Sequence, residues 1–124
     1  MMNEKTPDQL TANMLRKELW VVTTRPARGP GTRELLAEHL EYQVRLEREG
    51  KLFGAGPIYA EDSGVPEGGM IIFRAGNLEE ARELADADPM HAHGARTYTI
   101  HRWLLNEGAI TVTMRFSDQS LIVE

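Results

Sequence analysis

Histidine and aspartate side chains are the groups in this chain best suited by type and position to acid–base chemistry. The sequence contains no cysteine, which removes thiolate nucleophiles, disulfides, iron–sulfur sites and cysteine-based zinc sites. His39 lies in a stretch with helical periodicity, and Asp88 directly precedes a proline. A carboxylate that contacts an imidazole fixes its tautomer and stabilises its protonated form, which is the minimal general acid/base pair. These two residues are the candidates for such a pair.

His39 belongs to the most clearly helical segment, residues 32–49. The segment contains no glycine or proline, and Gly50 follows it where a helix favours a left-handed residue. Helical periodicity predicts that His39 and Gln43 fall inside an inward apolar arc. That arc consists of Leu35, Leu36, Leu40, Tyr42, Val44 and Leu46. A buried-face histidine is more often a hydrogen-bonded core residue than a catalyst, so its position alone favours a structural role.

Asp88 follows a second predicted helix. Asn77 and Glu80 have the capping-box spacing, which predicts a helix from Leu78 to about Ala87. The proline after Asp88 keeps that residue out of the helical conformation, so its carboxylate is free to face the end of the sheet. A solvated residue at a helix stop is the alternative interpretation, and position alone favours the two equally.

Strands must flank these helices to position the pair. Runs rich in β-branched and aromatic residues predict strands at 18–24, 51–59, 69–75 and 96–105. Together with the helices they give the order βαββαβ, which is the ferredoxin-like α+β pattern. The almost wholly apolar run 69–75 indicates a central strand. Residues 110–116 alternate apolar and polar, which predicts an extra C-terminal strand that extends the sheet or crosses to a partner.

Length and composition predict one folded domain. The chain has 124 residues, of which 41% are hydrophobic and 27% charged, as in ordinary globular proteins. Residues 1–16 are polar and aperiodic, so we expect a flexible N-terminal tail. Residues 17–124 then form a single domain, with a core at 18–105 and a C-terminal strand extension at 106–124.

Charge and hydropathy limit the partners. The net charge is -5 and no long basic run is present, which argues against nucleic acid. No apolar stretch predicts a membrane span or a secretory leader, so we expect a cytoplasmic protein. Two short helices cover only one face of a four-stranded sheet whose strands are apolar on both faces. We therefore expect a homodimer or higher homo-oligomer that buries the open face.

The remaining histidines suggest a weaker metal hypothesis. His91 and His93 alternate in sequence and share one face if that segment is extended, but a third ligand at motif spacing is missing. His101 lies within a predicted strand, where cross-strand packing is the favoured role. We expect no metal site, and no glycine-rich phosphate loop opens a helix.

Several sequence motifs resemble the YciI-like (YCII-related) family over about residues 18–105. The matching pieces are His39-Leu40, Gly50-Lys51-Leu52, Ala55-Gly56-Pro57, 69–72, 78–81, Ala87-Asp88-Pro89 and 100–103. The resemblance implies a ferredoxin-like fold that pairs into a dimeric α/β barrel, with a His–Asp dyad at His39 and Asp88. Relatives of known activity include muconolactone isomerase-like and chlorinated-hydroxyquinol dehydrochlorinase-like enzymes of aromatic breakdown.

The expected function is a cofactor-independent lyase or isomerase acting on a small cyclic or enolic carbonyl compound. His39 and Asp88 are the expected catalytic residues, with no cofactor. The expected substrate-pocket residues are Arg25, Gln43, Gly56, Pro57 and Met70. One alternative is a non-catalytic small-molecule-binding or accessory module that uses the same pocket. Another is a haem- or metal-using relative with His91 or His93 as ligand.

Overall fold

The computed structural model describes residues 4–27 and 31–124. The chain divides into two compact units, Glu18–Leu104 and a second unit made of Met1–Lys17 and Leu105–Glu124. Residues 28–30, and the first three residues of the expected N-terminal tail, lie outside the described residues.

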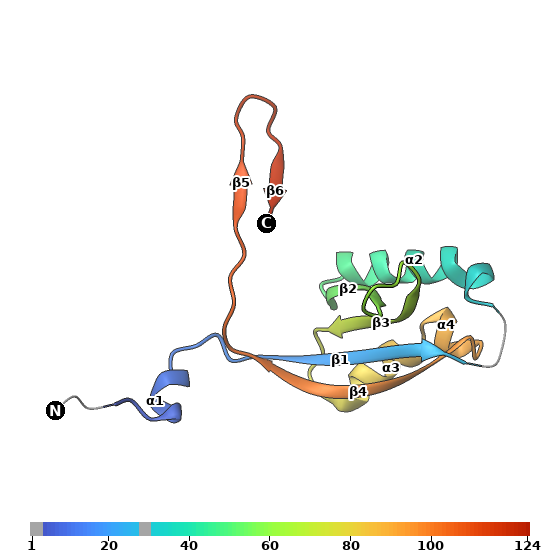
Figure 1. Ribbon diagram of the computed structural model, residues 1–124, viewed down its shortest axis with the longest axis horizontal. Helices are drawn as coiled ribbons and strands as arrows, with labels where there is room; N and C mark the ends of the chain where they lie inside the picture. Colours follow the sequence, from blue (N-terminus) through green and yellow to red (C-terminus); the bar gives the residue numbers. More distant parts are fainter. Residues whose placement is uncertain (1–3, 28–30) are drawn as a thin grey trace. The chain divides into compact units, whose positions relative to one another are not determined.

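The larger unit has the expected ferredoxin-like α+β fold (Figure 1). Its strands and helices are β1 (Lys17–Pro26), α2 (Thr32–Arg48), β2 (Leu52–Tyr59), β3 (Pro66–Phe73), α3 (Leu78–Asp86), α4 (Pro89–Ala92) and β4 (Arg96–Leu105). The strand order is β2-β3-β1-β4, which confirms the predicted βαββαβ arrangement and the central position of β3. The single turn α4 was not predicted, and it lies where a loop was expected.

The register of the sheet separates its two faces. Antiparallel pairing places Trp20 opposite Phe73, and Val22 opposite Ile71. Alternation along each strand points these four side chains to one face, where they are buried in one cluster with residues of α2 and α3. The helices therefore cover the face that carries these two residue pairs.

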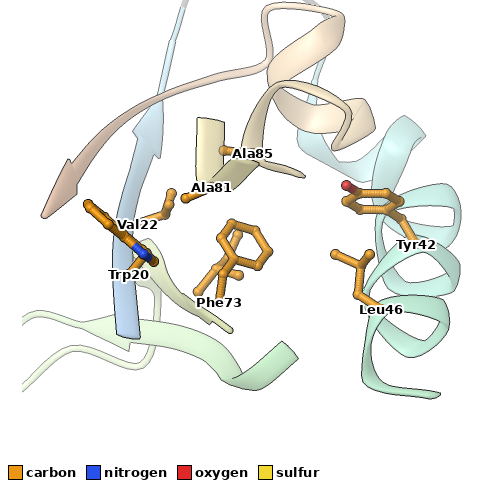
Figure 2. Packing of buried hydrophobic residues seen from close by; sticks show 8 residues of the cluster. Trp20, Val22, Tyr42, Leu46, Phe73, Ala81 and Ala85 are labelled. Atoms are coloured by element: carbon orange, nitrogen blue, oxygen red, sulfur yellow. The ribbon is translucent and has the colours of Figure 1, made fainter. Parts of the chain in front are cut away.

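The core lies between that face and the helices (Figure 2). Phe73 is fully buried between strand residues, two alanines of α3, and Tyr42 and Leu46 of α2. The Tyr42 hydroxyl donates to the Leu84 carbonyl oxygen at 2.6 Å, which ties α2 to α3. The Trp20 indole N–H donates to the Ala75 carbonyl oxygen at 3.2 Å. Small residues on α3 let that helix approach the sheet closely.

The inward arc expected on α2 is only partly buried. Tyr42, Gln43 and Leu46 are buried, as predicted, whereas one stripe of the arc keeps 43–52% exposure. That stripe consists of Leu36, Leu40 and Val44, and it lines a cavity instead of the core. The prediction that the whole arc packs inward was wrong, because a helix wheel does not show whether a neighbour or an open cavity faces each side.

The smaller unit contains a short helix and a hairpin. Helix α1 (Pro7–Thr11) begins at a capping box formed by Thr6 and Gln9, within the segment expected to be an aperiodic tail. Strand β5 (Val112–Met114) is shorter than the predicted strand at 110–116, and it pairs with β6 (Leu121–Val123) rather than with the four-stranded sheet. A nearby segment can close a hairpin at low entropic cost, which favours this local pairing. Among the described residues, no helix combines the length and hydropathy that a membrane crossing requires.

Candidate active site

A cavity of about 750 Å³ opens between α2 and the strands of the larger unit. Its lining is mostly apolar and includes the exposed stripe of α2 together with residues of β2 and β3. The polar side chains that reach it are few: His39, Gln43, Thr24 and Arg96 are among them. Pockets that are largely apolar with a few placed polar groups are typical of sites for small molecules.

His39 and Asp88 form a close pair beside this cavity. His39 Nδ1 lies 2.9 Å from Oδ1 and 2.8 Å from Oδ2 of Asp88. The imidazole comes from the middle of α2, and the carboxylate comes from the junction of α3 and α4. A carboxylate only accepts hydrogen bonds, so Nδ1 is the donor and Nε2 carries the lone pair of the neutral ring.

The sequence around Asp88 explains how its carboxylate is held. Asp88 has an extended backbone, as expected for a residue before proline, and it is the N-cap of α4. Its Oδ1 accepts the Met90 backbone N–H at 2.9 Å, and its Oδ2 accepts the Gln43 side-chain amide at 3.0 Å. The side chain is completely buried, yet three donors satisfy it.

These contacts determine the charge of Asp88. Burial by itself raises the pKa of a carboxyl group, but the hydrogen bonds from His39 and the Met90 amide oppose that effect. The nearby imidazoles of His39 and His91 act in the same direction, and the pKa of Asp88 is held below its ordinary value of 3.8. Asp88 is therefore an anion at neutral pH, and it orients His39 with one ring nitrogen left for the cavity.

The other expected pocket residues fall into two groups. Gln43, Gly56, Pro57 and Met70 all line the cavity. Arg25 does not line it: the side chain is exposed and borders a separate, smaller depression of about 120 Å³. Alternation along β1 places Arg25 on the face opposite Thr24, so the period-two pattern could have excluded Arg25 from the cavity.

Thr24 and Arg96 are pocket residues that the sequence analysis missed. Thr24 is buried and continues the alternation of Trp20 and Val22 along β1. Arg96 begins β4, in the alternation that places Tyr98 and Ile100 against the core. This period-two pattern was the available signal for both residues.

His91 is committed to the fold rather than to the cavity. Its Nδ1 lies 2.7 Å from the Ala85 carbonyl oxygen, and its ring packs against Tyr98 with centroids 4.8 Å apart. Its Nε2 is buried without a hydrogen-bond partner among the described residues. His93 is exposed at the end of α4. Residues 4–27 and 31–124 contain no cluster of three His, Asp or Glu side chains that could hold a metal ion.

Comparisons with known proteins agree with this architecture. The uncharacterized protein YjpA of Bacillus subtilis (strain 168) is 38% identical over 74 residues, which are 60% of this chain and 81% of that protein. A solved structure of 5-chloro-2-hydroxyhydroquinone dehydrochlorinase (TftG) from Burkholderia phenoliruptrix AC1100, in complex with 2,5-dihydroxybenzoquinone, matches with a TM-score of 0.53. It is 24% identical, and the match covers 68% of this chain and 92% of that chain, which supports the fold. The model of the YCII-related domain matches residues 18–104, so this chain belongs to the YCII-related family.

Proposed function

We propose that this protein is a cofactor-independent lyase or isomerase that moves a proton on a small cyclic or enolic carbonyl compound. One observation carries the proposal: His39 lines a cavity while its Nδ1 is held by a buried, ionised carboxylate. Its second nitrogen forms no hydrogen bond with any residue in the described part of the chain. A general base needs this combination of fixed tautomer and open nitrogen.

The proposed reaction begins when His39 Nε2 removes a proton from a carbon next to a carbonyl group. The C–H electron pair passes to the carbonyl oxygen as an enolate, and the negative charge of Asp88 stabilises the imidazolium that forms. In an isomerase, the imidazolium returns the proton to another carbon of the same molecule. In a lyase, the electrons return and expel a leaving group such as chloride with its bonding pair. Proton transfer by a positioned histidine contributes about 10²–10⁴-fold to such a rate.

The size and the apolar walls of the cavity support a ring-sized substrate. Its volume of about 750 Å³ exceeds that of a single aromatic ring with substituents, and its walls include Leu36, Leu40 and Val44. The fold relative of known activity is a dehydrochlorinase of a hydroxylated chlorinated ring. Chlorinated quinols and small lactones are therefore the first compounds to test.

The open face of the sheet supports a further proposal, that two copies of the chain form a homodimer. Val21 pairs with Ile72 on the face opposite the core, where both are only half-buried. Elsewhere in the larger unit, the rings of Trp103 and Phe53 pack edge to face with centroids 6.4 Å apart and keep 36% and 41% exposure, and Phe53 also lines the cavity. A partner subunit would remove these side chains from water. Light scattering at micromolar concentration should give the mass of a dimer, and a uniform monomer would overturn the proposal.

The test of the proposed function compares two histidine variants. Purified protein is assayed for product formation with a panel of chlorinated quinols and lactones, followed by chromatography. His39→Ala should abolish turnover while the circular dichroism spectrum is retained. His93→Ala removes an exposed imidazole outside the cavity and is the matched control, which should keep full activity. A His39→Ala protein that retains full activity would overturn the assignment, and binding without turnover would favour a non-catalytic binding module.

A further inference from the structure

Arg96 brings a positive charge to the same cavity without a negative partner. Its side chain is half-buried at the start of β4 and lines the cavity together with His39. Nη1 donates to the Thr24 hydroxyl at 2.9 Å, and Nε is buried with no acceptor among the described residues. No carboxylate in residues 4–27 or 31–124 forms a salt bridge with this guanidinium.

The surroundings of Arg96 hold the guanidinium in place. Thr24 is 3% exposed, so the oxygen that accepts from Arg96 is fixed within the sheet. A methyl group on Gly69 would lie 3.4 Å from Arg96 Nη1 and 3.5 Å from Thr24 Oγ1. Both distances are ordinary van der Waals contacts, so the guanidinium and the Thr24 hydroxyl both lie against β3 at this residue. A charged group that a buried hydroxyl positions in this way is a built feature of the cavity.

The other charged groups of the cavity leave this cation uncompensated. Asp88 already accepts hydrogen bonds from His39, Gln43 and the Met90 amide. Glu47 and Arg33 also line the cavity, but both are exposed and carry opposite charges. Removing a cation partly from water is costly unless an anion or acceptor pairs with it. Nothing within the described chain supplies that anion. A molecule bound in the cavity would therefore have to supply it.

We propose that Arg96 is a specificity-determining residue that binds an anionic oxygen of the substrate, either a carboxylate or an ionised phenol or enol. This inference rests on the proposed function because it names the substrate class for the cavity that contains His39. Arginine suits this task, since its planar guanidinium donates in parallel to the two oxygens of a carboxylate or to neighbouring oxygens on a ring. The substrate then enters as an anion, with Arg96 holding its charged oxygen and His39 acting on a carbon.

Equilibrium binding of matched anionic and neutral probes tests this assignment. Calorimetry measures benzoate against benzamide for the carboxylate, and 2,5-dihydroxybenzoquinone against 2,5-dimethoxybenzoquinone for the ionised enol. The wild-type protein should bind at least one anion about 10–100-fold more tightly than its neutral counterpart, as expected for hydrogen bonds to a charged group. The pair that shows this preference identifies the source of the oxyanion. Equal binding within both pairs, or no anion binding, would overturn the proposal.

Substitutions locate the preference at Arg96. Arg96→Gln should abolish the preference for the anion, whereas Arg25→Gln, which removes an exposed charge outside the cavity, should leave it unchanged. An anion preference that survives in folded Arg96→Gln would contradict the proposal. If Arg96→Gln does not fold, Arg96→Lys keeps the charge but loses the planar fork, and it should weaken anion binding without removing the preference.

These binding measurements do not depend on turnover. A protein that prefers anions through Arg96 but processes no substrate would support this inference and contradict the proposed acid–base function. Turnover that requires His39 but is equally fast with neutral and anionic substrates would support the acid–base function and contradict the role proposed for Arg96.

Discussion

Two histidines, His39 and His91, lie near the junction of α3 and α4, and their environments differ in ways that decide what each imidazole does. Both place Nδ1 against an oxygen, at 2.8 Å from Asp88 for His39 and at 2.7 Å from the Ala85 carbonyl for His91. The His39 side chain keeps 21% exposure and lines the cavity. The second nitrogen of His91 is buried without a partner among the described residues.

Acid–base chemistry requires more than a histidine next to an oxygen. A carboxylate partner stabilises a proton arriving at the ring, whereas a neutral backbone carbonyl stabilises it less. An open second nitrogen gives a substrate access, and a buried one does not. By these two criteria His39 is suited to proton transfer, and His91 connects the end of α3 to Tyr98, whose hydroxyl donates to Asp86 at 2.7 Å.

Removing the carboxylate from the His39 site should have the largest effect on stability. Asp88→Ala leaves the donors of His39, Gln43 and the Met90 amide without their acceptor in a buried position. We expect the free energy of unfolding to fall by about 3 kcal/mol or more in urea denaturation. Asp86→Ala is the matched control, because Asp86 is exposed and should cost less than about 1 kcal/mol. Equal losses of stability in the two variants would contradict the expected difference between the buried Asp88 and the exposed Asp86.

Acid should lower the free energy of unfolding because the Asp88 carboxylate that holds His39 becomes protonated. The pKa of Asp88 is lower in the folded chain than its ordinary value of 3.8, so the unfolded chain binds more protons between these two values. The stabilisation is complete above the unfolded pKa and is lost as the pH falls through the folded pKa. Between about pH 5 and about pH 3, the free energy of unfolding measured by denaturation should fall more for wild type than for Asp88→Asn. Parallel losses would show that Asp88 is not the group responsible.

The His91 site should respond as a structural contact. His91→Ala removes the hydrogen bond to the Ala85 carbonyl and the packing against Tyr98. We expect a loss of about 1–2 kcal/mol in the free energy of unfolding, with activity per folded molecule unchanged. His93→Ala serves as the control and should change stability by no more than about 0.5 kcal/mol. A loss of turnover in folded His91→Ala would remove the distinction between the two histidines.

The smallest expected effect is a change in the pKa of Tyr42, which depends on the charge of Asp88. Burial, followed by the negative charge of Asp88, raises the pKa of Tyr42 from 10.0 to about 12. Because the neutral phenol is favoured in the folded chain, this contribution to stability is present below pH 10.0 and is lost as the pH rises towards about 12. Ultraviolet titration of Asp88→Asn should show a slightly lower pKa for Tyr42 than in wild type. An unchanged or higher value would indicate that Asp88 is not ionised beside it.

Local patterns in the sequence predicted the elements that carry the dyad. The absence of glycine and proline predicted α2, the Asn77 cap predicted the start of α3, and Pro89 predicted the extended backbone of Asp88. The contact between His39 and Asp88 depends on how two helices pack, which no local pattern specifies. Residue type and position made these two residues candidates for a pair, and the family resemblance implied that they form a dyad.

Other features depended on tertiary surroundings that the sequence does not display. The exposed stripe of α2 at Leu36 and Leu40 has the same periodicity as a buried one, so its position beside a cavity was not predictable from the wheel. Arg96 was overlooked because a charged residue at the start of a strand usually faces water. The strand at 110–116 was expected to extend the main sheet or to cross to a partner, but within this chain it pairs with β6, which lies only a few residues further along.

Deuterium exchange into a substrate shows whether His39 removes a carbon-bound proton. A quinol or lactone that the protein accepts is incubated in deuterium oxide with wild type, His39→Gln or His91→Ala. Nuclear magnetic resonance follows the carbon next to the lactone carbonyl or, in a quinol, the ring carbon next to a hydroxyl-bearing carbon, which is the carbonyl of the keto tautomer. Wild type and His91→Ala should incorporate deuterium at similar rates, whereas folded His39→Gln should lose about 10²-fold or more of that rate. Exchange at the wild-type rate in His39→Gln would show that His39 is not the base.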